Sequence, residues 1–438
     1  MTKRKLSLGS DRLGEILSPA SDKFAAWLTS GQKENGFYIY LYGIFTISLV
    51  STLGLYFLGR VVFFEALGVP TMPLAFGDIR VLTGLNETLR LGLDPLVENP
   101  GDPWGRPFNQ PRVWMIAAYL GLNQAHSIYI GFFLLALYLL STTLIAKKLT
   151  RSATLFFLFA AFSPPAQLLL ERGNNDLVIL FLLTIGILSY QKHKFISFTL
   201  IFVSFFLKLF PIFAASIFLN LKPRKLLVYI LPTAILILGF SYICWEDFKL
   251  IVSNTQYSMV LSFGARVVAW TIEAKLQKFG LVVDWLQPLA MFLAGIIFFL
   301  AYLHARQTEL IKVREGFEID SFRVGASLYM FTFIFGNNWD YRLIFLIFVI
   351  PQIVAWAASQ PGLTRLLSQF ALIAMVITLL SSLIVHLPSG FVRYVGYAFD
   401  EGSNWVLFVL MTQLFFRSSP PWVFFRGKMR CRSKVNLE

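Results

Sequence analysis

Two groups of polar residues lie beside long apolar stretches, and both contain residue types suited to group-transfer chemistry. The first holds Asp78 and Arg80 and follows the first apolar stretch of the chain. The second, Asn174-Asn175-Asp176, directly precedes another apolar stretch. A carboxylate can remove the proton from an attacking hydroxyl group, and ionisable groups beside lipid-facing stretches are costly and usually functional. The two groups therefore predict a site that transfers a chemical group at a membrane surface.

Four later residues carry charges that could complete such a site. Lys208 interrupts an apolar stretch, where a lysine is costly unless it reaches the interface or meets an anion. Arg266 lies in a polar segment, and Asp340 and Arg342 lie in a tight polar turn. Cations at these positions could hold a phosphate and stabilise the charge that grows on it as it leaves. We therefore expect all four residues to contact substrate.

Each of these residues also has a purely structural interpretation. Asp78 and Asp176 could cap helices, since Asp is favoured at that position. Lys208 could extend its ammonium to the membrane interface. Asp340 and Arg342 could pair with each other across the turn, which by itself contributes little. The residue types alone leave both interpretations open.

The composition indicates that lipid solvates most of the chain. Of the 438 residues, 56% are apolar and 14% are charged, whereas a soluble protein has about 25% charged residues. The apolar stretches are continuous rather than alternating, which favours helices over a membrane barrel. The net charge of +14 is spread between the apolar stretches. The positive-inside rule explains that distribution better than a nucleic-acid partner does.

The pattern predicts an all-α polytopic membrane protein of about 10–12 transmembrane helices. Residues 1–36 form a cytoplasmic N-terminal segment, 37–417 the transmembrane domain and 418–438 a basic cytoplasmic tail. Residues 195–221 are predicted to form a hairpin that turns near Lys208. Both termini are then cytoplasmic, and a bacterial plasma membrane is favoured.

Three polar segments are predicted to lie on the outer face, at about residues 65–112, 171–176 and 245–285. The first is long enough to carry short helices and is more often functional than merely connecting. The four histidines and two cysteines show no metal-ligand spacing. We therefore expect neither a bound metal nor another cofactor.

The order of these features resembles the GT-C glycosyltransferases. The early Asp78, the turn Gly92-Leu93-Asp94-Pro95 and the segment Pro107-Phe108-Asn109-Gln110-Pro111 are similar to the first outer loop of that class. The combination of Gly173-Asn174-Asn175-Asp176 with Lys208-Leu209-Phe210-Pro211 resembles glycosyltransferase family 87, which includes users of polyprenyl-phosphate mannose. The resemblance covers roughly residues 60–350.

The resemblance implies a GT-C-like bundle in which Asp78 is the catalytic base and Lys208 lies near the carrier phosphate. Asn174, Asn175 and Asp176 would then shape the donor or acceptor site. The implied enzyme moves a hexose, with mannose favoured, from a polyprenyl-phosphate donor to a hydroxyl group on the extracytoplasmic face. The acceptor could be a glycan, a lipid or a protein.

Two other functions are compatible with a multi-span chain of this kind. One is a transporter or flippase for a lipid or small molecule, and the other is a polymerase or ligase for lipid-linked oligosaccharides. Transporters usually have related halves with paired broken helices near the bilayer midplane. This sequence predicts one broken hairpin, and its acidic residues concentrate at one surface. The transferase is therefore favoured.

Overall fold

The computed structural model describes residues 19–30, 35–255, 258, 260–336, 338–385 and 390–424. Helices make up 78% of the structure. Within the described residues, the one sheet is an antiparallel pair of two-residue strands, β1 (Ser262–Phe263) and β2 (Asn338–Trp339). Several of the helices are long and apolar, so the chain is an all-α membrane-embedded protein, as predicted. The basic residues from 425 onward lie outside the described part of the chain.

Five helices of the described chain are long and apolar enough to cross a membrane. They are α2 (Phe37–Ala66), α6 (Ser127–Ala146) with the preceding η2 (Gln124–His126), α11 (Pro223–Ile243), α14 (Leu286–Gln307) and α17 (Gly362–Val385). Two bent pairs raise the number to seven: α7 (Arg151–Ala161) with α8 (Pro164–Arg172), bent by 51°, and η4 (Asp340–Phe348) with α16 (Ile350–Ser359), bent by 55°. The predicted count of ten to twelve is therefore not confirmed.

Several predicted spans are short or charged helices in the structure. The shorter apolar helices are α9 (Asp176–Tyr190), α10 (Lys194–Leu207) and η3 (Phe210–Asn220). Of two longer helices, α15 (Phe317–Phe335) carries three charged residues within its first seven positions, and α18 (Gly390–Arg417) also contains charged residues. Further helices are α12 (Trp245–Asn254), α13 (Ala265–Lys278), η5 (Pro421–Phe424) and a helix over 19–30.

The core of the bundle is built around α15, which is buried along almost its whole length. Gly325 lets η4 and α16 approach this helix closely, because a Cβ there would lie 2.8 Å from Cγ1 of Val349. By contrast, α2 and α11 present apolar side chains that are mostly exposed. Exposed apolar helices around a buried centre are the arrangement that a lipid environment requires.

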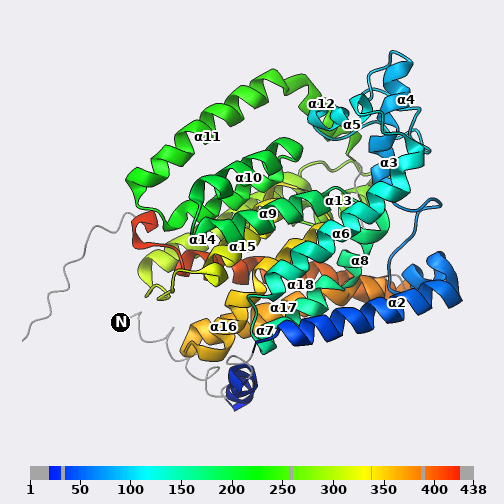
Figure 1. The fold of residues 1–438 in the computed structure, drawn as a ribbon. Helices are drawn as coiled ribbons and strands as arrows, with labels where there is room; N and C mark the ends of the chain where they lie inside the picture. Colours follow the sequence, from blue (N-terminus) through cyan, green and yellow to red (C-terminus); the bar gives the residue numbers. More distant parts are fainter. Residues whose placement is uncertain are drawn as a thin grey trace, which may run out of the picture.

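The residues before α2 also pack against the bundle. Ser152 of α7 donates a hydrogen bond of 2.8 Å to the carbonyl of Leu28, and Thr29 donates one to the carbonyl of Ala358 in α16. The helix over 19–30 thus lies against α7 and α16 (Figure 1). The helix α2 begins at Phe37, where the transmembrane domain was predicted to begin.

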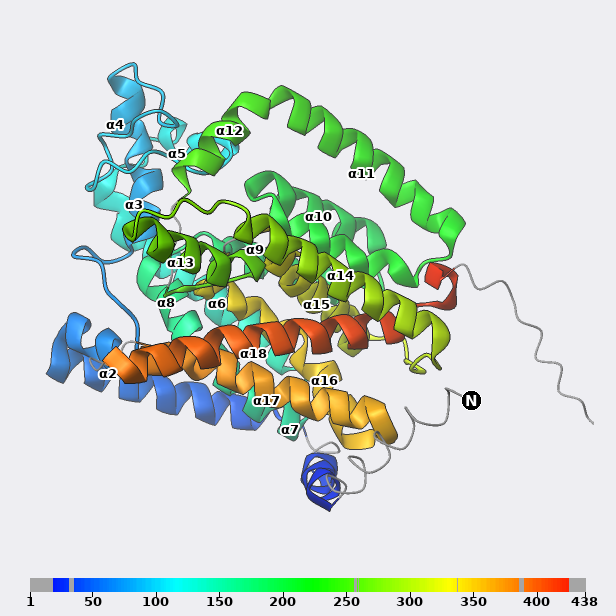
Figure 2. The ribbon, with the colours of Figure 1, turned by 180° about the vertical axis from the view of Figure 1, so that it is seen from behind.

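Short helices gather at the other end of the bundle. They are α3 (Gly77–Thr83), α4 (Leu85–Arg90), η1 (Arg112–Met115) and α5 (Ile116–Tyr119), all within or just after the predicted first outer loop. They lie beside α12 in both views (Figures 1 and 2). A hydrogen bond of 2.8 Å between Thr83 and Ser127 joins α3 to the start of α6.

The predicted hairpin is present and turns where the sequence indicated. The helix α10 ends at Leu207, Lys208 has an extended backbone (φ −151°, ψ 142°), and η3 begins at Phe210. Pro211 lies in the first turn of η3, where its missing N–H costs no hydrogen bond. The extended residue and the proline together stop α10 and place Lys208 at the turn.

Candidate active site

A polar cavity of about 220 Å³ lies where α3, the loop after it, the α8–α9 junction, the α10–η3 turn and the β2–η4 segment meet. Most of its lining side chains are charged, amide-bearing or aromatic. The lining residues are Met72, Asp78, Val81, Arg106, Pro107, Asn109, Gln110, Arg172, Asn174, Lys208, Asn254, Thr255, Trp339, Tyr341 and Arg342. Each of the two polar groups singled out in the sequence therefore contributes one residue to the lining, Asp78 and Asn174.

The position of Asp78 depends on an unusual residue directly before its helix. Phe76 has a left-handed backbone (φ 57°, ψ 50°), which is rare for a residue with a bulky side chain. Its N–H donates a hydrogen bond of 3.1 Å to the carbonyl of Glu171. Its ring fits against two glycines: a Cβ at Gly131 would lie 2.2 Å from the ring, and one at Gly173 would lie 2.9 Å from Cβ of Phe76. These contacts fix where α3 begins.

The loop before Phe76 is held by a second set of contacts. Gly59 (φ 75°) breaks α2, and Arg60 then donates a hydrogen bond of 2.7 Å to Glu171. The same carboxylate oxygen accepts the N–H of Met72 at 3.1 Å. Glu171 is buried and also lies 3.3 Å from Arg172, so it belongs to an internal ion-pair network.

Asn174 links Asp78 to the rest of the site. Its Oδ1 accepts hydrogen bonds from Nζ of Lys208 at 3.0 Å and from the N–H of Asp176 at 2.9 Å. Its Nδ2 donates a hydrogen bond of 2.6 Å to Oδ2 of Asp78. Two donors on the oxygen fix the orientation of the amide, so its NH₂ group must face the carboxylate. Gly173, left-handed at φ 58°, ends α8 and turns the chain into this position.

Lys208 and Asp176 form a buried ion pair with a 2.5 Å separation between Nζ and Oδ1. Both residues are at least nine-tenths buried, so the ammonium faces the protein interior. The alternative in which Lys208 extends to the membrane interface is therefore wrong. Arg342 approaches the other oxygen of Asp176 at 3.5 Å, and its guanidinium lies over the ring of Phe210.

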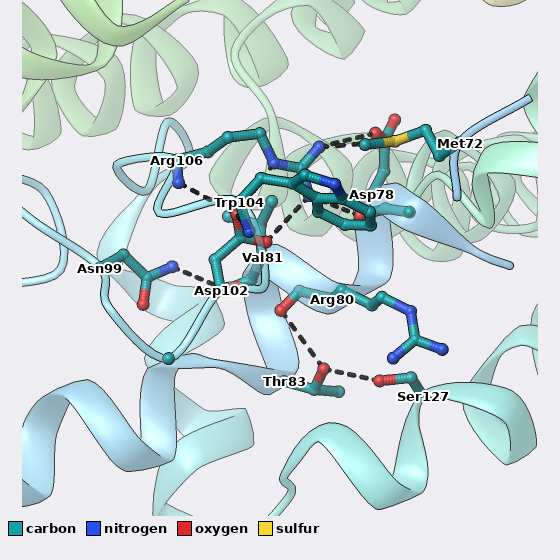
Figure 3. A network of polar contacts seen from close by, with 12 residues as sticks. Met72, Asp78, Arg80, Val81, Thr83, Asn99, Asp102, Trp104, Arg106 and Ser127 are labelled. Carbon is teal, nitrogen blue, oxygen red and sulfur yellow. Dashed lines mark hydrogen bonds and ion pairs between the residues drawn. The ribbon is translucent and has the colours of Figure 1, made fainter. Parts of the chain in front are cut away.

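Arg106 is a site residue that the sequence did not single out. Its guanidinium lies 3.7 Å from Oδ1 of Asp78 and donates hydrogen bonds to the carbonyl of Gly77 and to both oxygens of Asp102. It also lies over the ring of Trp104 (Figure 3). Asp102 in turn accepts the N–H groups of Trp104 and Arg106, as expected for a turn residue. The spacing from Asp102 to Arg106 is the signal that could have identified this contact.

Five residues predicted to bind substrate do not line the cavity: Arg80, Asn175, Asp176, Arg266 and Asp340. Arg80 bonds to the carbonyl of Ala75 and to Gln124, and its guanidinium points away from Asp78 (Figure 3). Arg266 contacts Gln287, which joins α13 to α14. Both side chains serve contacts between elements.

Asp340 also lies outside the cavity lining, and its predicted pairing with Arg342 is absent from the described contacts. Its carboxyl group is buried, and its N–H bonds to the carbonyl of Leu261 at 2.8 Å. The physical reason is the 3₁₀ geometry of η4, in which residues two apart face different sides. Asn175 also lies outside the lining, but its Nδ2 donates to Gln110, which does line the cavity.

Besides Arg106, the cavity contains Arg172, Trp339, Tyr341 and Asn254, none of which the sequence analysis assigned to the site. Arg172 lies two positions before the predicted group Asn174-Asn175-Asp176. Trp339 and Tyr341 are the sequence neighbours of the predicted Asp340 and Arg342. Neighbouring positions in the same turns were therefore the available signal. Within the described chain, no group of three or more His, Cys, Asp or Glu residues could hold a metal ion.

The arrangement places one carboxylate, Asp78, beside several cations and amides in a cavity at the end of an apolar bundle. Such a cavity can accept a proton at the carboxylate and hold an anionic group at the cations. Comparison of the chain with protein-family models, curated proteins and solved structures finds no match.

Proposed function

We propose that this protein is a membrane glycosyltransferase that moves a hexose, with mannose favoured, from a polyprenyl-phosphate donor to an acceptor hydroxyl group. The observation that carries the proposal is the continuous chain of contacts from Asp78 through Asn174 to Lys208, Asp176 and Arg342. It connects a carboxylate able to take a proton with cations able to hold a phosphate. The resemblance to GT-C enzymes in the sequence supports the same assignment.

In the proposed reaction, the acceptor oxygen attacks the anomeric carbon of the donor sugar. A new carbon–oxygen bond forms there while the bond to the phosphate oxygen breaks, and that oxygen leaves with the electron pair. Asp78 takes the proton of the acceptor hydroxyl group. Lys208, Arg342 and Arg172 supply positive charge for the leaving polyprenyl phosphate.

The proposal also includes a membrane location. The cavity lies at the end of the bundle formed by the predicted outer segments, and basic residues are predicted at the opposite ends of the spans. We therefore propose that the site faces the extracytoplasmic side of a bacterial plasma membrane. The prenyl chain would stay in lipid while the sugar enters the polar cavity.

The experiment that tests the proposal compares the parent protein with Asp78→Asn. Both are purified and incubated with polyprenyl-phosphate mannose, with and without membrane extract as the source of acceptor. We expect the parent to release polyprenyl phosphate only when acceptor is present. Asp78→Asn should release it at a rate lower by at least about 100-fold, because the general base is lost and a general base contributes a rate factor of this order.

Asp284→Asn is the matched control, because Asp284 is exposed and lies outside the cavity lining. This variant should release polyprenyl phosphate at the parent rate. Equal release by Asp78→Asn and the parent would remove Asp78 from the mechanism. Stable donor binding without any release by the parent would instead favour the transporter or flippase.

A further inference from the structure

The cavity contains a set of uncharged polar and aromatic side chains that the proposed transfer step does not use. The aromatic members are Trp339 and Tyr341, and the amide-bearing members are Asn109, Gln110 and Asn254. None of them can take the role of the base or neutralise a phosphate. Their chemistry instead suits a ligand with many hydroxyl groups.

Trp339 and Tyr341 present a rigid, flat apolar surface to the cavity. Their rings are stacked, with centroids 6.2 Å apart and planes only 5° from parallel. The backbone around Trp339 is fixed by the pairing of β2 with β1, in which Trp339 opposes Ser262, and by the bond from the N–H of Asp340 to the carbonyl of Leu261. Trp339 is only partly buried, so an area of its indole remains available to a ligand.

The amides offer hydrogen-bonding groups that the described residues leave unused. Asn109 has no side-chain hydrogen bond in the part of the chain that the structure describes. Gln110 accepts from Asn175 through Oε1, which leaves its Nε2 donors for a ligand. Asn254 donates to the carbonyls of Leu96 and Phe108, which leaves its Oδ1 as an acceptor.

A pyranose ring matches both kinds of group. Its C–H face is apolar and flat enough to stack on an aromatic ring, and its edge carries hydroxyl groups that donate and accept. Neutral amides pair with hydroxyl groups without the desolvation cost of a charge. A pocket that combines aromatic walls with a few placed polar groups is the usual form of a small-molecule site.

We propose that Trp339 and Tyr341, together with Asn109, Gln110 and Asn254, bind the acceptor, and that the acceptor is a pyranose sugar stacked on Trp339. The role of this sugar as an acceptor rests on the proposed transferase function. The binding of a pyranose can be measured without any transfer. The sugar could be a soluble glycan or the head group of a glycolipid. The two sources share the ring that the cavity recognises.

The test uses the full chain in lipid nanodiscs that contain no glycoside detergent, since such detergents carry sugars themselves. Binding of methyl α-mannopyranoside, and of octyl α-mannopyranoside added to the nanodisc lipids, is measured by saturation-transfer NMR without any donor. The parent should bind, and Trp339→Ala should bind at least tenfold more weakly. Trp339→Phe keeps a flat ring and should fall between the two. Tighter binding of the octyl glycoside would identify a lipid-linked acceptor.

Trp285→Ala is the control, because Trp285 is exposed and lies outside the cavity lining. It should bind as the parent does, and unfolding temperatures should confirm that all variants are folded. Equal binding by the parent and a folded Trp339→Ala would overturn the proposal, as would no pyranoside binding by the parent. Trp339-dependent binding without any donor turnover would support this site while the transferase proposal fails.

Discussion

Asn174 holds one oxygen of Asp78 through a hydrogen bond of 2.6 Å between residues 96 positions apart in the sequence. The other oxygen of Asp78 faces Arg106 at 3.7 Å. The carboxylate is thus oriented from both sides while it still lines the cavity. In the proposed transfer, this fixed orientation reduces the reorganisation that the base needs when the acceptor arrives.

Replacing Asn174 by Asp should therefore impair catalysis more than folding. The variant loses the NH₂ donor and places a second carboxylate against Asp78, so the two groups repel each other. We expect the rate of polyprenyl-phosphate release to fall by about 10²-fold, the usual size for a lost preorganised contact. Asn86→Asp is a matched control, since it also loses an amide donor, here to the carbonyl of Ala118, but outside the cavity. An Asn174→Asp variant with near-parent rates would contradict this role.

Substitutions of Lys208 and Asp176 should have strongly non-additive effects on the stability of the fold. Lys208→Met leaves the Asp176 carboxylate buried, with only Arg342 nearby at 3.5 Å. Removing one partner of a buried pair costs about 3–5 kcal/mol, whereas replacing both by apolar residues is often neutral. We expect Lys208→Met to lower the unfolding temperature, and Lys208→Met with Asp176→Leu to recover most of the loss without recovering activity.

Lys249→Met is the control for the loss of stability expected in Lys208→Met. Lys249 and Glu246 also form a 2.7 Å ion pair, but both side chains are more than half exposed. An exposed pair contributes at most about 1 kcal/mol, so this variant should unfold almost as the parent does. Equal decreases in unfolding temperature for Lys208→Met and Lys249→Met would show that the buried pair contributes no more to stability than the exposed pair.

Gly131→Ala should disturb the site without touching any substrate. A Cβ there would lie 2.2 Å from the ring of Phe76, which directly precedes the helix carrying Asp78. Overpacking of this kind costs about 1–3 kcal/mol, and relief requires Phe76 and α3 to move. We expect a lower unfolding temperature and reduced transfer. Gly295→Ala, where no atom lies within 4 Å of an added Cβ, should leave both unchanged. Unaltered transfer by Gly131→Ala would show that α3 is not positioned through Phe76.

The folded structure of the segment around Asp94 should not change with pH over the neutral range. Two hydrogen bonds from Arg112 hold the pKa of Asp94 below its ordinary value of 3.8, and Arg112 also bonds to Asp247 of α12. A carboxyl group whose pKa is lowered by folding stabilises the fold above its ordinary pKa. That stabilisation is lost only as the pH falls through the lowered value.

Hydrogen exchange of residues 94–108, corrected for intrinsic rates, measures this directly. Protection should stay constant from pH 8 to pH 5 in the parent. Arg112→Gln should exchange faster over the whole range, since the tie between the loop and α12 is gone. A fall in the parent's protection between pH 7 and pH 5 would contradict the assignment.

The fold class and the centre of the site could be predicted from sequence because both depend on local patterns. Continuous apolar stretches indicated membrane helices. The hairpin followed from the interruption at Lys208–Pro211 and from the basic clusters that border the stretch at both ends. The number of spans could not be predicted in this way, since α9, α10 and η3 are apolar but short. Hydropathy reports the solvent around a segment and not how far the segment extends.

Residues of the candidate site could be predicted from sequence only where a charged side chain beside lipid is energetically costly. Lys208 and Asp176 stood out because charge is expensive beside lipid, and the structure pairs them. Arg106 and Trp339 lie in segments where arginine and tryptophan are ordinary, so their residue types alone did not distinguish them. Arg80 and Asp340 were misplaced because side-chain direction depends on the helix that carries each residue. That direction becomes visible only once the elements are assembled.

The 32-residue separation between Asp176 and Lys208 has a consequence for how the chain is made. Asp176 begins α9 and is synthesised 32 residues before Lys208. The ammonium therefore finds its counter-ion in the nascent chain when the α10–η3 hairpin enters the bilayer, where an unpaired charge would oppose insertion. Trp339 and Arg342 are synthesised much later. Membrane integration of the early helices thus precedes the completion of the cavity, which awaits the final third of translation.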